Sequence, residues 1–170
     1  MPINRSWWTA LVDDDGSGLT GTNWNKAAIA GLLDSIDGMF EGHQPWTPQL
    51  LFGGASTGWV VTVNGARYAR ADALVLVEAQ LTVATVGSAT GIATIVGLPY
   101  PAAALTSPQA IVDPASGLAG LTGALMGVHA GGIIYLVMQP PASAAGRVLM
   151  TNAHFPAGAQ INVSMTYRRA

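Results

Sequence analysis

The sequence predicts a mainly β protein, an antiparallel jelly-roll-like β-sandwich preceded by one short N-terminal α-helix. Three observations support this: one long strand pattern in residues 73–86, many shorter strand-like runs separated by turn residues, and a single stretch of helical period near the N-terminus. In residues 73–86, Val75 and Val77 alternate with Glu78 and Gln80, which is the period of a half-buried strand. Short strands separated by turns are typical of sandwiches and barrels.

The composition predicts that partner chains cover part of the surface. Half of the 170 residues are hydrophobic and only 9% are charged, against roughly 25% in ordinary soluble domains. A symmetric homo-oligomer would bury the resulting apolar surface. The net charge of -2 argues against a nucleic-acid partner, which would need a basic face to neutralise phosphates. The chain contains no cysteine, which excludes disulfides and thiolate metal sites.

Charge divides the chain into two parts, residues 1–45 and residues 46–170. The first part carries six acidic residues against two basic ones, whereas the second carries five arginines against three acids. Such an asymmetry marks a boundary. Residues 42–48 are predicted to be the linker because Pro45 and Pro48 each bias the preceding residue to extended backbone. We therefore expect an N-terminal attachment segment and a β-sandwich head domain.

The predicted helix covers about residues 22–37, with Thr22 as N-cap and Gly38 as C-terminal stop. A helix of about 15 residues is marginal alone in water, so its apolar stripe needs a cover. Either the equivalent helices of sister chains or the chain's own β head could provide that cover. The stripe forms a predicted attachment or oligomer interface and consists of Trp24, Ala28, Ile29, Leu32, Leu33 and Ile36.

Two features precede the helix. Trp7 and Trp8 are either intramolecular core or an anchor inserted into another protein, because buried tryptophan dominates interface energetics. Asp13, Asp14 and Asp15 suggest calcium, but the EF-hand template places Trp24 where an acidic ligand is required. We therefore interpret the three aspartates as a solvated turn, and a looser cation site between chains stays open.

The rest of the chain is predicted to be strands and turns. Asn64 and Gly65 are predicted to form a turn before the long strand. The uncharged residues 118–138 are about long enough to cross a bilayer, but Gly131 and Gly132 interrupt them. Two buried strands joined at that glycine pair fit better, so we expect no membrane insertion. The expected strands are residues 49–52, 59–63, 66–70, 73–86, 92–96, 109–112, 118–128, 133–138, 147–150 and 160–167.

Several motifs in roughly residues 18–100 carry a family resemblance. They are the Trp-Thr-Pro opening at residues 46–48, the Arg-Tyr-Ala-Arg motif at residues 67–70, and the segment 91–99 that ends in Gly-Leu-Pro. Together with residues 21–37, they resemble a β module of small tailed-bacteriophage fibre and other virion surface proteins. Beyond Pro101 the chain is richer in alanine and glycine than that family's pattern.

The resemblance implies a homotrimer whose β heads pack about a threefold axis and whose N-terminal segments bind other virion proteins. The chain would then be made in the host cytoplasm and lie on the virion surface. A tail fibre for host adsorption and a capsid decoration protein both fit this plan, and a carbohydrate-binding module that recognises a host-surface glycan is the further alternative. Glycan binding would require exposed aromatic side chains, for which the candidates are Trp59, Tyr68, Tyr100 and Tyr135.

No catalytic site, metal site or cofactor site is predicted. His43, His129 and His154 lack a carboxylate or second histidine at the spacing of metal ligands. Ser56 lies in a Gly-x-Ser-x-Gly pattern without the strand-to-helix elbow of a nucleophile, so we interpret that segment as a turn. We therefore expect a non-enzymatic protein.

Overall fold

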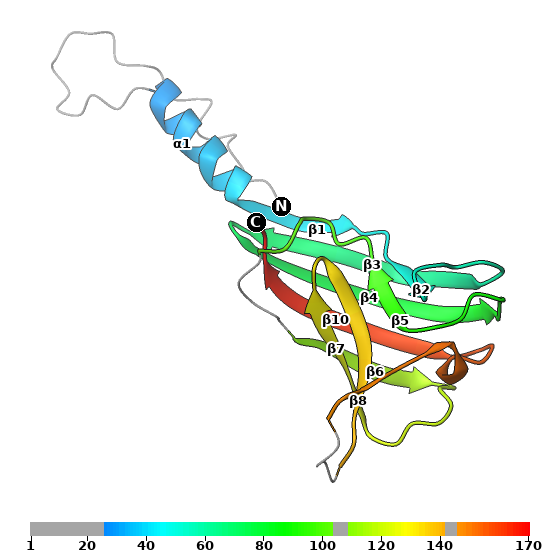
Figure 1. The fold of residues 1–170 in the computed structure, drawn as a ribbon. Coiled ribbons are helices and arrows are strands. Elements are labelled where there is room, and N and C mark those ends of the chain that lie inside the picture. The colour runs from blue at the N-terminus through cyan, green and yellow to red at the C-terminus, as the bar shows by residue number, and fades with distance from the viewer. Residues whose placement is uncertain (1–25, 104–108, 142–145) are drawn as a thin grey trace, which may run out of the picture.

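The computed structural model describes residues 26–103, 109–141 and 146–170 (Figure 1). One α-helix is followed by antiparallel strands and one short 3-10 helix. The mainly β class with a single short helix is therefore confirmed. The elements are α1 (Lys26–Met39), β1 (Phe40–Pro45), β2 (Gln49–Phe52), β3 (Val60–Ala71), β4 (Leu74–Thr85), β5 (Ala93–Val96), β6 (Gln109–Ser116), β7 (Ala124–Ala130), β8 (Ile133–Gln139), β9 (Val148–Leu149), η1 (Asn152–His154) and β10 (Gln160–Arg168).

The ten strands of the described residues belong to one curled sheet. The strand order is β1-β3-β4-β10-β6-β7-β8-β5-β2, and β9 pairs with β8. Phe52 at the end of β2 packs against Trp59, just before β3, with ring centroids 4.0 Å apart. Strands from opposite ends of the order therefore meet across one shared core. The two-sheet jelly-roll arrangement stays a prediction.

Strand β4 lies inside the sheet, between β3 and β10, as its alternating pattern predicted. Val75, Val77 and Leu81 are buried on the inner face, while Glu78 and Gln80 lie on the outer face. Each fully buried side chain of this kind contributes roughly 1.5 to 3 kcal/mol. The inner faces of β4 and β10 thus supply the centre of the core, while the outer face of β4 is polar at Glu78 and Gln80 and apolar at its start, where Leu74 lies.

Two predicted boundaries are wrong. Residues 42–45, predicted to be linker, belong to β1, which pairs with β3 through Phe40 opposite Ala71. Asn64 and Gly65, predicted to be a turn, form a bulge inside β3, where the register shifts between Val63 and Gly65. Strand pairing overrides the local turn preference in both segments. The sheet therefore begins at Phe40 rather than at Trp46.

The uncharged residues 118–138 form neither a helix nor one continuous element. They contain β7 and most of β8, which pair as a hairpin. Gly131 and Gly132 join the two strands with φ values of 59° and 82°, the two left-handed positions of a type I′ turn. The predicted pair of strands joined at the glycine pair is confirmed, but the first strand begins at Ala124 rather than at residue 118. Within the described ranges, no helix has both the length and the apolar character needed to span a bilayer.

Helix α1 extends away from the sheet (Figure 1). The structure describes it from Lys26 to Met39, so the helix runs two residues past the predicted end at residue 37, whereas the predicted residues 22–25 lie outside the described residues. None of its described side chains belongs to the hydrophobic core. The earlier residues, and with them the predictions on Trp7, Trp8, Trp24 and the three aspartates, lie outside the described residues.

Candidate functional site

A surface of mixed polar and apolar character crosses the outer face of strands β3, β4, β10 and β6. Antiparallel register places one side chain from each strand in line, so that the outer face carries rows perpendicular to the strands. Two neighbouring rows are relevant. The first consists of Arg67, Glu78, Ser164 and Ile111, and the second consists of Gly65, Gln80, Asn162 and Asp113.

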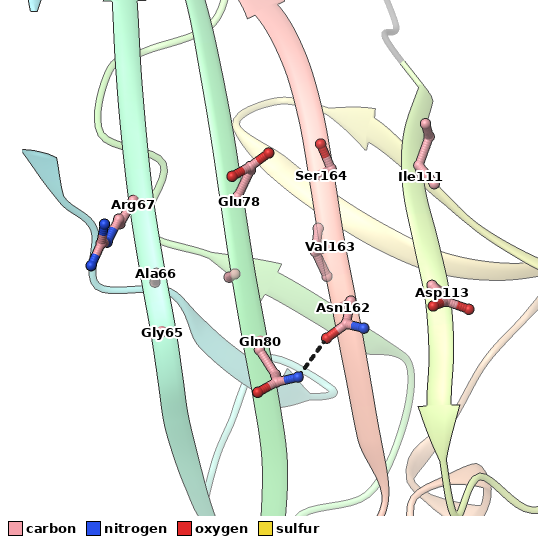
Figure 2. Close-up of a pocket in the computed structure, with 11 residues that line it drawn as sticks. Gly65, Ala66, Arg67, Glu78, Gln80, Ile111, Asp113, Asn162, Val163 and Ser164 are labelled. Atoms are coloured by element: carbon pink, nitrogen blue, oxygen red, sulfur yellow. Dashed lines mark hydrogen bonds between the residues drawn. The ribbon is translucent and has the colours of Figure 1, made fainter. Parts of the chain in front are cut away.

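These rows line an open pocket of about 410 Å³ (Figure 2). Its lining combines carboxylates, carboxamides, a hydroxyl group and one guanidinium group with apolar side chains. Gly65 opens one end of the second row because it has no side chain, and a Cβ atom there would meet nothing within 4 Å. The polar lining residues are Arg67, Glu78, Gln80, Asp113, Asn162 and Ser164.

The carboxamides at the centre of the pocket orient one another. Nε2 of Gln80 donates a hydrogen bond of 2.9 Å to Oδ1 of Asn162, and this bond is drawn in Figure 2. Both side chains are half-buried. The bond leaves the amide N–H groups of Asn162 and the amide oxygen of Gln80 available to a ligand.

Glu78 and Asp113 give the pocket a negative bias but do not form a metal site. They lie on β4 and β6, which are two strand steps apart, roughly 9.5 Å at about 4.8 Å per step. Figure 2 draws the two carboxylates on either side of β10. No group of three or more metal-ligating side chains occurs in the described part of the chain.

The four aromatic residues predicted as ligand contacts do not form one exposed platform. Trp59 is only 7% exposed, and its indole N–H donates to the carbonyl of Ala89 at 2.9 Å. Tyr135 lies half-buried in β8, opposite Val128. Tyr68 and Tyr100 are also half-buried. None of the four lines the outer-face pocket.

Tyr68 and Tyr100 are brought together on the core side of the sheet, opposite to the outer-face pocket. Their rings meet edge to face with centroids 5.7 Å apart. The guanidinium carbons of Arg70 and Arg169 lie 5.6 and 5.8 Å from the centre of the Tyr100 ring. These contacts engage the Tyr100 ring in cation–π interactions within the chain.

Tyr167 joins this cluster from β10. Its hydroxyl donates to the carbonyl of Tyr100 at 3.0 Å and accepts from the N–H of Tyr100 at 3.2 Å. Burial raises the pKa of Tyr167, while the hydrogen bond to the backbone of Tyr100 acts in the opposite direction. The phenol therefore fixes the segment that crosses the end of the sheet.

The histidines have different surroundings. Nδ1 of His154 accepts a 3.0 Å hydrogen bond from the N–H of Thr151, and His43 is exposed on β1. His129 is only 3% exposed and stacks on Tyr167, with centroids 6.3 Å apart and an interplanar angle of 16°. Neither ring nitrogen of His129 has a hydrogen-bond partner among the described residues. Burial lowers the pKa of His129.

The predicted interface residues of α1 lie on one side of the helix. At about 100° per residue, Ile29, Leu32, Leu33 and Ile36 fall within an arc of about 100°, and Met39 widens it to about 120°. Leu32 is 54% exposed, and the other three predicted residues are half-buried. The structure therefore keeps the predicted stripe together, outside the core.

The outer-face pocket is not predicted by the sequence. Glu78 and Gln80 were recognised as the polar side of a strand, and Asn162 and Ser164 alternate with buried residues in the same way. That alternation was the available signal. Which polar strand faces lie side by side depends on sheet order, which pairs β10 with both β4 and β6.

Comparison with known proteins identifies no relative. No protein-family model matches the chain, and neither a curated protein nor a solved structure matches it.

Proposed function

We propose that this chain is a non-enzymatic virion surface protein, a small trimer anchored by its N-terminal segment with a projecting β head. The observation that carries the proposal is the position of α1. Its apolar stripe lies outside the core, and burying such a stripe is worth several kcal/mol. Three sister helices packed together would bury the stripes against one another.

A second apolar area supports an assembly near the base of the head. Phe40 lies opposite Ala71, which lies opposite Leu74, so the three form one row across β1, β3 and β4. Phe40 is 61% exposed and Leu74 is 50% exposed. This row begins where α1 ends. Contacts between heads in a trimer would cover this row together with the helical stripe.

The virion assignment comes from the resemblance of the motifs in roughly residues 18–100. A fibre or spike for host adsorption is the first form of the proposal, and a capsid decoration protein is the second. Both use an N-terminal attachment segment and an outward head of jelly-roll type. Since β1 starts at Phe40, we now end the attachment segment at Met39.

Sedimentation equilibrium at micromolar concentration tests the trimer. The chain has a mass of 17.4 kDa, so a trimer sediments at three times that mass. Leu32→Glu puts a charge into the stripe and should dissociate the trimer on dilution. Gly31→Glu adds the same charge outside the arc of the stripe, at a position where a Cβ atom meets nothing within 4 Å, and should leave the trimer intact. A stable monomer of the unaltered chain would refute the proposal.

Particle incorporation tests the attachment role. Chains lacking residues 1–39 should fold as β heads, by circular dichroism, yet be missing from purified particles in immunogold microscopy. The full-length chain is the control. Labelled particles with the truncated chain would overturn the assignment of the N-terminal segment.

A further inference from the structure

We propose that the outer-face pocket of β3, β4, β10 and β6 binds a neutral carbohydrate. The inference deepens the proposed function, because it names a ligand class for the projecting head. It does not depend on the trimer, since every lining residue comes from one chain. The aromatic side chains expected of a glycan site from the sequence are not part of this pocket, where the exposed side chain of Ile111 provides the apolar contact instead.

The hydrogen-bonding groups of the pocket match a sugar. Each sugar hydroxyl both donates and accepts. The carboxylates of Glu78 and Asp113 accept only, whereas the carboxamide of Asn162 offers both donors and an acceptor. Carboxylates form the stronger, charge-assisted bonds to hydroxyl donors. A ligand with several adjacent hydroxyl groups can therefore satisfy the lining without carrying a charge of its own.

The groups are held in place before a ligand arrives. Asn162 is paired with Gln80 on β4 and with Asp113 on β6, so neighbouring strands fix its position on both sides. The 2.9 Å bond from Gln80 further orients its amide. Pre-organised side chains lose little entropy on binding, which favours recognition of a weakly binding ligand.

An apolar wall completes the site. Ile111 closes the first row and is 74% exposed, a large fraction for an isoleucine in a strand. Gly65 and Ala66 leave room at the opposite side of the pocket. A pyranose ring has apolar C–H faces as well as hydroxyl edges. Ile111 could cover such a face while the carboxamides bind the edge.

Other ligand classes fit less well. Anionic ligands would meet two carboxylates, and the guanidinium group of Arg67 points away from Glu78 in Figure 2. No group of three or more metal-ligating side chains occurs among the described residues, which argues against a metal ion. A cationic amine would satisfy the carboxylates but would leave the carboxamides and Ile111 without a role. The observations therefore favour an uncharged, polyhydroxylated ligand.

Saturation-transfer difference NMR with the full chain tests the site. The probes are methyl glycosides of glucose, galactose and mannose, followed by an array of neutral oligosaccharides. We expect at least one probe to bind, and its affinity should not change between 50 and 300 mM salt. Asn162→Ala and Asp113→Asn should each weaken it roughly tenfold, the loss of one good hydrogen bond. Ile111→Ala should weaken it as well.

Asp72→Asn is the matched control. It removes an exposed carboxylate outside the pocket, at a position with φ of 52° that asparagine tolerates, and should leave binding unchanged. The inference is overturned if no neutral glycan binds, if Asn162→Ala binds normally, or if a salt-sensitive amine binds instead. Repeating the assay with Leu32→Glu separates the two proposals. If the dissociated monomer still binds the glycan, the carbohydrate site does not depend on the trimer.

Discussion

The guanidinium group of Arg70 in β3 donates a hydrogen bond of 2.7 Å to the carbonyl of Gly38 in the last turn of α1. Next to it, the N–H of Asp72 donates to the carbonyl of Met39 at 2.6 Å. The last carbonyls of a helix have no partner inside the helix, and positive charge is favourable there. The turn between β3 and β4 thus holds the end of α1 to the head.

Arg70→Ala should loosen that connection. We expect a loss of about 1–2 kcal/mol, because the substitution removes a charge-assisted hydrogen bond and a cation–π contact with Tyr100. Limited proteolysis should then cut faster near residues 38–40. Arg67→Ala, on the outer face of the same strand, is the control. Equal cleavage rates in both variants would contradict the assigned role.

His129 should make the fold sensitive to acid. Its folded-state pKa is lowered by burial, so the neutral ring is the form that the fold tolerates. The stabilisation is fully present above the unfolded-state pKa of about 6.5, and it is lost as the pH falls through the lower folded-state pKa. Urea unfolding between pH 7.5 and pH 5 should show this decline.

His129→Phe is expected to flatten that pH dependence, because the ring can still stack on Tyr167 without gaining a charge. The control is His43→Gln, which removes an exposed histidine from β1 and should leave the decline unchanged. If His129→Phe declined with pH as steeply as the unaltered chain, another group would be responsible.

Tyr167→Phe should destabilise the head by about 1–2 kcal/mol, since it removes two hydrogen bonds to the backbone of Tyr100 and keeps the ring. Thermal unfolding measures the effect. Tyr135→Phe, on β8, tests whether loss of any tyrosine hydroxyl has the same effect. We expect a smaller loss of stability for Tyr135→Phe. A larger loss would argue against a particular role of the Tyr167 hydroxyl.

Gly127→Ala should cost about 1–3 kcal/mol through overpacking. A Cβ atom at that position would lie 2.6 Å from Cβ of Ala110 and 2.7 Å from Cγ2 of Ile134. Gly31→Ala in α1 is the contrast, because a Cβ atom there meets nothing within 4 Å and alanine is the better helix former by about 1 kcal/mol. The midpoint of chemical denaturation should therefore fall for Gly127→Ala and rise for Gly31→Ala.

The local sequence pattern was sufficient to predict most of the strands. The alternation in residues 73–86 and 160–167 corresponds to β4 and β10, and the glycine pair after Ala130 marks the turn between β7 and β8. Each of these signals lies within a few residues of sequence, because side-chain direction alternates along a strand and left-handed backbone favours glycine.

The local sequence pattern gave the wrong secondary structure in two segments where pairing with a neighbouring strand decides the structure. Asn64 and Gly65 have the composition of a hairpin turn, yet β3 continues through them because β4 is long enough to pair on both sides of the bulge. Residues 42–45 contain a histidine, a glycine and a proline, yet they form an edge strand beside β3. An edge position tolerates proline, since one side of the strand needs no hydrogen-bond partner.

The sequence by itself determined that the chain is mainly β, that one amphipathic helix precedes the strands, and that β4 and β10 each have one polar side. Only the tertiary structure decided that these polar sides adjoin, because β4 and β10 are separated by about 75 residues of sequence and their pairing depends on the whole strand order. The same order buries Trp59 and makes Asn162 and Asp113 neighbours. The pocket therefore arises from long-range pairing, which no local spacing of residues encodes.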